Sequence, residues 1–389
     1  MTHSIVRLPR PLLWTMAFTC GAVVANLYYN QPLLVVIAQD FQAAPSLTGL
    51  LPMLTQVGYA TGVLLLVPLG DLLEKRRLII LMLGASAIAL AIAAAAPSLS
   101  WLLGASWAIG VTSISAQLIV PFAAQLAAPE ARGNVVGIVM SGLLIGVLLA
   151  RTVSGWVGAI FDWRTMYWLA SGLMLLLGLG LSRFLPKSQS SLKVSYLSLI
   201  RSLFPLLTQP VLRETALIGA MSFAAFSAFW STLAFRLAAP PYHYGSEVTG
   251  LFGLVGIVGA VAAPIAGKLA DRGDPKLTAG IGLASTTLSF LLFWGFGQRL
   301  WGLVAGVILL DWGVQSTQIS NQAQIYGLPA EFHSRLNALY ITLYFVGGAI
   351  GSLAGAFGWT HFGWSGVCIV ALFMIGVAWT KFIPGASSK

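Results

Sequence analysis

Long apolar stretches recur along the whole chain from Trp14 to Phe382, and each is bounded by charged residues, prolines or glycine clusters. Twelve such stretches begin near positions 12, 46, 77, 99, 134, 164, 214, 246, 276, 300, 335 and 363. Each is long enough to cross about 30 Å of hydrocarbon at about 1.5 Å of rise per residue. The pattern therefore predicts an all-α polytopic membrane protein with twelve transmembrane helices and both termini on one side of the membrane.

The composition agrees with this interpretation. Of 389 residues, 58% are hydrophobic and 8% are charged, against about 25% charged in ordinary soluble domains. The net charge of +10 does not indicate a nucleic-acid partner, because the basic residues form short clusters between apolar stretches and no nucleic-acid motif is present. Cys20 and Cys368 lie inside apolar stretches, so the sequence predicts neither a disulfide framework nor a metal site or other cofactor.

The distribution of lysine and arginine predicts the orientation. If the amino terminus is cytoplasmic, seventeen of the twenty-one basic residues lie on the cytoplasmic side, as the positive-inside rule requires. Arg164 and Arg299 fall in outer loops, whereas Arg151 and Arg236 fall within or at the end of a span. We expect a multi-pass protein of the bacterial inner membrane with both termini in the cytoplasm, and a first span that is retained because no cleavage site follows it.

One long polar connection divides the chain into two halves. We predict an N-terminal six-helix half at residues 1–186, a cytoplasmic central loop at 187–213 and a C-terminal six-helix half at 214–389. Asp71 and Asp271 close corresponding spans 200 residues apart, which indicates an internal repeat. Many secondary transporters are built from such repeats, with the substrate site near the midplane between the halves.

The loops then resemble those of the major facilitator superfamily over nearly the whole chain. Residues 267–272 read Gly-Lys-Leu-Ala-Asp-Arg and match the loop motif of that family, and residues 130–133 resemble its loop between spans four and five. The resemblance extends to the proton-coupled drug and sugar exporters. However, Ser106 stands where those exporters carry an arginine in span four, and Arg151 stands where they carry a proline in span five. Antiport is therefore not implied by these two motifs.

The resemblance also implies a set of gating residues near the cytoplasmic ends of the spans. In this family an acidic residue near helix ends and basic residues across the interface between the halves stabilise the outward-facing arrangement. The corresponding residues here are Asp71, Arg76, Arg77, Gly267, Asp271 and Arg272.

Asp311 is the single acidic residue deep in a predicted span, and the other ten lie at span ends or in loops. A charged side chain at the centre of a bilayer costs about 2.5 to 3.5 kcal/mol, so such a residue should be protonated, paired or facing water. We predict that Asp311 binds and releases the coupling proton. The alternative is a structural hydrogen bond to a neighbouring helix.

Arg151 lies about 17 residues into the fifth span, roughly 25 Å from its cytoplasmic end and beyond the midplane. It could pair with Asp311 across the two halves, anchor an anionic group of the substrate, or snorkel to the outer headgroups. Arg236 ends the seventh span just before two prolines, where snorkelling and a place in the cavity vestibule are both open.

Uncharged polar residues are concentrated in the first and tenth predicted spans, where exposure to lipid would be costly. In the family that the chain resembles, the first, fourth, seventh and tenth spans line the central cavity. The resemblance therefore places the substrate cavity among Asn26, Tyr29, Asn30, Gln31, Gln56, Tyr59, Gln117, Arg236, Gln315, Gln318, Asn321 and Gln322. Interhelical hydrogen bonding is the alternative role for these side chains.

Together these features predict a secondary transporter that moves a small organic solute by alternating access. Proton-coupled efflux of amphipathic compounds is the leading interpretation, and proton-linked or facilitated transport of a sugar or an organic anion is the alternative. A membrane enzyme or receptor is disfavoured, because the sequence holds no nucleotide loop, metal-ligand cluster or nucleophile with a base at useful spacing. The expected partners are the solute, protons and membrane lipid, and we expect a monomer.

Overall fold

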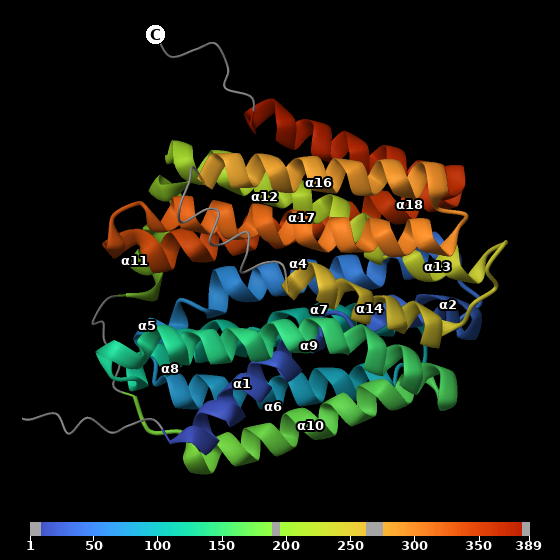
Figure 1. Ribbon diagram of the computed structural model, residues 1–389. Helices are drawn as coiled ribbons and strands as arrows, with labels where there is room; N and C mark the ends of the chain where they lie inside the picture. Colours follow the sequence, from blue (N-terminus) through green and yellow to red (C-terminus); the bar gives the residue numbers. More distant parts are fainter. Residues whose placement is uncertain (1–8, 189–194, 262–274, 383–389) are drawn as a thin grey trace, which may run out of the picture.

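The computed structural model describes residues 9–188, 195–261 and 275–382. Within this part of the chain all regular structure is helical. The helices lie in two groups, and most of their axes run roughly parallel to one another (Figure 1).

The helices that precede the central connection follow the predicted spans. They are α1 (Arg10–Ala25) and α2 (Asn30–Asp40) for the first span, α3 (Pro45–Thr48), α4 (Leu50–Leu66) and α5 (Leu69–Leu72) for the second, α6 (Lys75–Ala94) for the third, α7 (Leu99–Thr112) and α8 (Ser115–Leu126) for the fourth, α9 (Arg132–Ile160) for the fifth, and α10 (Trp163–Phe184) for the sixth. A short helix, α11 (Tyr196–Arg201), and a 3-10 turn at Phe204–Thr208 lie in the central connection.

The helices after the connection are α12 (Pro210–Trp230) and α13 (Leu233–Ala238) for the seventh span, α14 (Ser246–Val261) for the eighth, α16 (Pro275–Phe296) for the ninth, α17 (Leu300–Tyr326) for the tenth, and α18 (His333–Phe382) for the last two. Helix α18 holds 50 residues, about 75 Å if it were straight, which is more than twice the hydrocarbon thickness of a bilayer. Gly363 breaks it with φ 60° and ψ −148°, and this break agrees with a twelfth span starting near position 363.

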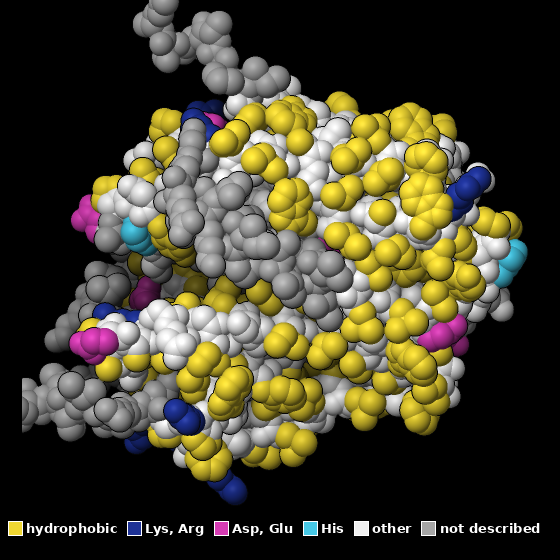
Figure 2. Space-filling model, viewed as in Figure 1, with side chains coloured by type: hydrophobic (Ala, Val, Ile, Leu, Met, Phe, Trp, Pro, Cys, Tyr) yellow, Lys and Arg dark blue, Asp and Glu magenta, His cyan; other side chains and the backbone are white. Residues whose placement is uncertain are grey.

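Ten helical segments of the described chain are long and apolar enough to cross a membrane. The break in α18 divides one of these segments into two, and α14 supplies a further span of 16 described residues. The protein is therefore an all-α multi-pass membrane protein with the predicted spans. Large apolar side chains cover the visible face of the molecule, whereas the charged side chains gather toward its two ends (Figure 2).

The first span is broken between α1 and α2, and the sequence explains the break. Pro32 has no N–H group to donate, and its ring would clash with the carbonyl of Tyr28 in a continuous helix. The chain responds with a tightened turn in which the N–H groups of Asn26, Leu27 and Tyr28 each donate three residues back. Such a turn within a helix commonly marks a hinge. It presents the polar residues of this span to the interior of the bundle.

The helices before the central connection form one packed group, and those after it form the other. Two helices make the main contacts between these groups. Helix α4 packs against both α7 and α18, and α14 packs against both α9 and α17, as their central places in Figure 1 show. The boundaries at residues 186 and 214 stay a prediction. Of the predicted gating residues, Gly267, Asp271 and Arg272 lie outside the described residues.

Candidate functional site

Arg151 is the most unusual side chain of the membrane interior. It lies on α9 with 1% of its surface exposed, so it does not reach the lipid headgroups, and the interpretation that it snorkels is wrong. Its Nε donates a hydrogen bond of 2.7 Å to Oε1 of Gln31 on α2. Its guanidinium carbon lies 3.9 Å from the ring centroid of Trp230 and 4.8 Å from that of Tyr28. Both terminal nitrogens are buried and have no hydrogen-bond partner among the residues that the structure describes.

Asp311 lies on α17 with 4% of its surface exposed. Its Oδ2 is buried and accepts no hydrogen bond from the described part of the chain. The carboxylate packs against Gly256 of α14, where an added Cβ atom would lie 3.3 Å from the carboxyl atoms. The glycine leaves just enough room for the carboxylate, and a structural hydrogen bond to a neighbouring helix is not what holds this oxygen.

The glycine face of α14 separates these two charged groups. Gly253 faces Arg151, with 3.1 Å between a built Cβ and the Arg151 Cβ, and Gly256 faces Asp311 one turn later. No ion pair joins the two groups among the described residues. A buried guanidinium and a buried carboxylate thus flank one helix, each with unused hydrogen-bonding capacity. Leaving buried charged groups incompletely paired is costly, and this cost is characteristic of functional sites within membranes.

The polar residues of the first span bind neighbouring helices of the same group. Asn30 Nδ2 donates to Oγ1 of Thr55 at 3.2 Å, and Asn26 Nδ2 lies 3.5 Å from Oγ of Ser113. The carbonyl oxygens of both asparagine side chains are buried and accept no hydrogen bond within residues 9–188, 195–261 and 275–382. Each side chain is therefore anchored by one end and keeps an acceptor free.

Gln56 links α4 to two helices of the other group. Its Nε2 lies 3.4 Å from Oγ of Ser227 on α12 and 3.3 Å from Oγ of Ser352 on α18. Nearby, Gln117 Nε2 donates to the Tyr59 hydroxyl at 3.0 Å, and the Tyr59 ring packs against Phe345 with 4.4 Å between centroids and a tilt of 48°. Side chains far apart in sequence therefore meet at the interface between the groups.

The polar residues of α17 divide into bound and unbound members. Asn321 Nδ2 donates to the carbonyl of Thr215 at 3.1 Å, and Gln318 accepts from the Tyr344 hydroxyl at 3.3 Å. Gln315 and Gln322 are half-buried and make no hydrogen bond to a described residue. Tyr29 is buried and lines a groove on the outer side of α1. The structure thus brings Gln31 directly to Arg151, whereas the other polar residues form separate pairs around the interface.

Arg236 is held by backbone carbonyls at one end of the bundle. Its Nε and Nη2 donate to the Gly297 carbonyl at 3.1 and 2.9 Å, and its Nη1 donates to Pro240 at 3.1 Å. The same carbonyl of Gly297 accepts from the hydroxyl of Tyr242, which lies outside the spans. Burial raises the pKa of this tyrosine, and nearby Arg236 lowers it by a smaller amount. Arg236 therefore joins two loops instead of reaching the lipid headgroups.

The described gating residues make local contacts. Arg76 donates to the carbonyl of Ser182, and exposed Arg77 pairs with Glu74 at 3.0 Å. Asp71 is half-buried in α5. The adjoining Lys75 Nζ donates to Oε1 of Gln125 on α8 at 2.8 Å. Each of these contacts lies within the part of the chain that precedes the central connection.

The aromatic neighbours of Arg151 on α12 were not predicted. Trp230 and Phe226 contact its guanidinium group. With Phe223 they form a set of aromatic residues, Phe223, Phe226 and Trp230, that recur every three or four positions. That spacing places them on one side of α12 and is the sequence signal that could have indicated an aromatic wall, although not its contact with Arg151.

Comparison with known proteins agrees with this architecture. The model of the Major Facilitator Superfamily matches residues 13–326 and 215–388. The chain belongs to the Major Facilitator Superfamily. As a member of this superfamily it is a transporter of small molecules and not an enzyme.

Its relatives in bacteria carry names of the same kind. The chain is 43% identical to the putative uncharacterized transporter YgaY of Escherichia coli, over 98% of both chains. It is 34% identical to the probable transporter SCO4007 of Streptomyces coelicolor, over 97% of this chain and 87% of that one. The solved structure of the nucleoside transporter NupG has the same fold, with a TM-score of 0.75 and 14% identity over 95% of this chain and 97% of that one.

Proposed function

We propose that the protein exports small amphipathic organic solutes in exchange for protons by alternating access. The observation that supports this proposal is the arrangement of Arg151 and Asp311 on the two flanks of α14. Both groups are buried, and each keeps nitrogen or oxygen atoms that bond to no described residue. In a major facilitator transporter, such atoms at the interface between helix groups are suited to bind a partner in one arrangement and lose it in another.

In this proposal Asp311 carries the proton. An ionised carboxylate without a hydrogen-bond donor is costly in a dry interface, so Asp311 takes up a proton when the two groups of helices close together and exclude water. When the two groups of helices separate, water enters and stabilises the carboxylate, so the proton is released. A difference in the affinity of the two arrangements for the proton is the coupling that alternating access requires.

The solute in this proposal binds beside Arg151 and the polar residues of α2 and α17. Tyr28, Phe226 and Trp230 offer aromatic faces, and Gln315 offers an amide that bonds to no described residue. A site that combines a few polar groups with aromatic walls suits an amphipathic solute. The remaining predicted cavity residues would shape the walls through the pairs that they form.

The test uses everted membrane vesicles that hold an acid-inside pH gradient, a fluorescent pH reporter and a panel of drugs, sugars and organic acids. We compare the wild type with Asp311→Asn and with Asp162→Asn, a matched control whose carboxylate lies 3.9 Å from Arg164 and is half exposed. Compound-dependent proton release in the wild type and the control, but not in Asp311→Asn, is the expected result. Equal release in all three proteins would refute the role of Asp311.

A second candidate function is favoured by the free nitrogens of Arg151. Two terminal guanidinium nitrogens, buried between aromatic rings and unbonded, match the two oxygens of a carboxylate. An organic anion would then be carried with protons or by facilitated transport, and a sugar would use the amides instead. If no compound moves protons in any of the vesicles, the exchange of labelled organic acids across the same membranes becomes the deciding measurement.

We also propose that the protein is a monomer of the bacterial inner membrane with both termini in the cytoplasm. The support is the distribution of basic residues, together with the internal repeat that divides the chain at residues 186 and 214. Asp71, Arg76 and Arg77, with Gly267, Asp271 and Arg272, would stabilise the outward-facing arrangement. Alkaline phosphatase and fluorescent protein fusions at either terminus test the topology, and an active phosphatase fusion would contradict it.

A further inference from the structure

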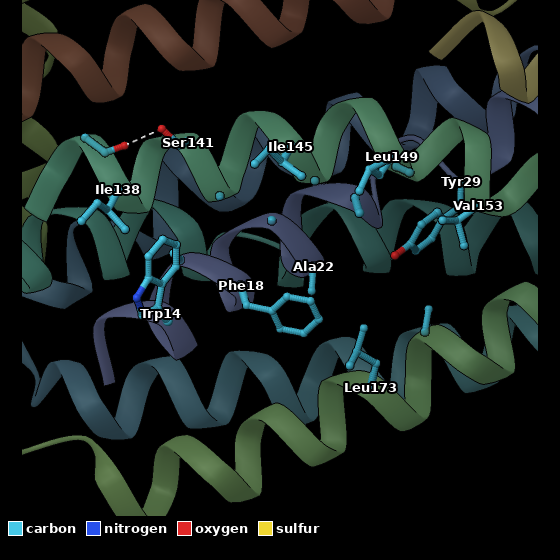
Figure 3. Close-up of a pocket in the computed structure, with 18 of the residues that line it drawn as sticks. Trp14, Phe18, Ala22, Tyr29, Ile138, Ser141, Ile145, Leu149, Val153 and Leu173 are labelled. Atoms are coloured by element: carbon cyan, nitrogen blue, oxygen red, sulfur yellow. Dashed lines mark hydrogen bonds between the residues drawn. The ribbon is translucent and has the colours of Figure 1, made fainter. Parts of the chain in front are cut away.

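A long groove runs along one outer side of the bundle, between α1, α9 and α10 (Figure 3). It has a volume of about 870 Å³. Its described walls are apolar apart from Tyr29, Asn134 and Ser141, and none of these lining residues is charged. The Ser141 hydroxyl already donates to the Gly137 carbonyl at 2.9 Å. The groove is therefore separate from the site of Arg151 and chemically suited to hydrocarbon.

Glycine residues of α9 create the groove. At Gly142 and Gly146 the helix touches the backbone of α1 near Ala17 and Gly21, so the two helices cross closely there. Gly133 and Gly137 also line the groove, and no atom lies within 4 Å of a Cβ added at either position. The two helices therefore approach closely around Gly142 and Gly146, and the groove is wider toward Gly133 and Gly137 because no side chain occupies it there.

The groove opens toward the membrane. Trp14 is 63% exposed, Phe18 is 58% exposed and Ile145 is 55% exposed, and these side chains lie along its length in Figure 3. From Trp14 to Tyr29 it follows the first span for roughly 22 Å, which exceeds the hydrocarbon depth of one leaflet, about 15 Å. An apolar groove of this length, parallel to the lipid chains, suits an extended acyl chain better than a compact solute.

A positive charge lies at the open end of the groove. Arg10 begins α1 one turn before Trp14, and positions four apart share a helix face. Arg10 is exposed, and no described acidic side chain pairs with it. Tryptophan at this level is typical of the interface between membrane and water, and basic residues there attract anionic headgroups. The end beside Arg10 therefore suits a lipid phosphate.

We infer that the groove binds one acyl chain of an anionic phospholipid, with the phosphate at Arg10. Moving an acyl chain from the bilayer into the groove brings no hydrophobic gain, because lipid is as apolar as the groove. Retention must then depend on the contact between phosphate and arginine and on the fit of the chain. The site should consequently prefer phosphatidylglycerol to phosphatidylethanolamine.

The test is native mass spectrometry of the full chain, released into mild detergent from nanodiscs of dioleoyl-phosphatidylglycerol and dioleoyl-phosphatidylethanolamine. We expect the wild type to retain one phosphatidylglycerol. Gly137→Trp should reduce the retained fraction at least fivefold, because the indole fills the channel where space is free. Gly104→Trp is the matched control, since Gly104 on α7 is also exposed with nothing within 4 Å of an added Cβ, and it should retain the lipid as the wild type does.

Arg10→Gln supplies the second arm. It should remove the preference for phosphatidylglycerol without changing the unfolding temperature. Retention of no lipid by the wild type, or equal retention by the wild type and Gly137→Trp, would overturn the inference. If Gly137→Trp keeps the lipid but loses solute transport, the groove is a path for the solute, and the lipid site is refuted.

Discussion

The guanidinium carbon of Arg151 lies 3.9 Å from the ring centroid of Trp230, so a cation on α9 is stacked on an aromatic side chain of α12. Stacking of this kind is worth about 2 kcal/mol when the cation is desolvated. Together with the bond to Gln31 it fixes the plane of the guanidinium while leaving the terminal nitrogens free. The geometry thus orients unsatisfied donors within the interface.

Arg151→Lys should reduce solute transport at least tenfold although it keeps the charge. An ammonium group lacks the planar face and the Nε donor, so it loses both the ring contact and the bond to Gln31. Initial rates in everted vesicles, with the compound identified by the panel, measure the effect. Arg164→Lys is the control, because Arg164 also stacks on a tryptophan, at 4.2 Å from Trp163, but lies partly exposed beside Asp40. Wild-type rates in Arg151→Lys would show that charge alone suffices.

Gly256→Ala should slow proton-coupled transport several-fold without unfolding the protein. The added methyl group lies 3.3 Å from the Asp311 carboxylate, so the carboxylate must shift by a few tenths of an ångström, at a cost of about 1 kcal/mol. Proton release in vesicles reports the coupling, and Gly104→Ala serves as the control because its methyl group meets nothing. Equal rates in the two variants would mean that the close fit at Gly256 is unimportant.

Gln56→Leu should destabilise the conformation described here relative to other conformations of the transporter. It removes two hydrogen bonds that join α4 to α12 and α18, each worth about 1 kcal/mol, so the population of this arrangement should fall at least about fivefold relative to its alternatives.

Spin labels at Gln39 and His243 measure this change. These exposed residues come from α2 and from the loop after α13, and they line one pocket of about 340 Å³. The distance distribution should gain a longer component in Gln56→Leu. Gln117→Leu, which loses a bond to Tyr59 between α8 and α4, should leave the distances unchanged. Identical distributions in Gln56→Leu and the wild type would contradict the prediction.

Arg236→Ala should lower the free energy of unfolding by about 3 kcal/mol, because the carbonyls of Gly297 and Pro240 lose a charged hydrogen-bond donor. Thermal unfolding in detergent measures the effect, and Arg236→Lys should recover part of it. An unchanged midpoint combined with lost transport would instead assign Arg236 to the solute path.

The fold follows from the sequence because lipid imposes long apolar helices with few alternatives. The predicted starts match the observed helices, including the break at Gly363, and Asp311 was recognised because a carboxylate inside an apolar stretch is conspicuous. The partners of Gln56 could not be predicted, since they lie 171 and 296 residues away in the chain. The burial of Arg151 and the carbonyl partners of Arg236 depend in the same way on helices that are distant in sequence.

The glycine contact between α14 and α9 bears on the rate at which these two helices separate. Gly250 and Gly253 lie against the backbone of α9 near Arg151 and Leu148, so two smooth helix surfaces touch without interlocking side chains. Glycines contribute no side chains that must disengage when such surfaces part. The rate at which α14 and α9 separate should then depend mainly on the few polar contacts between them.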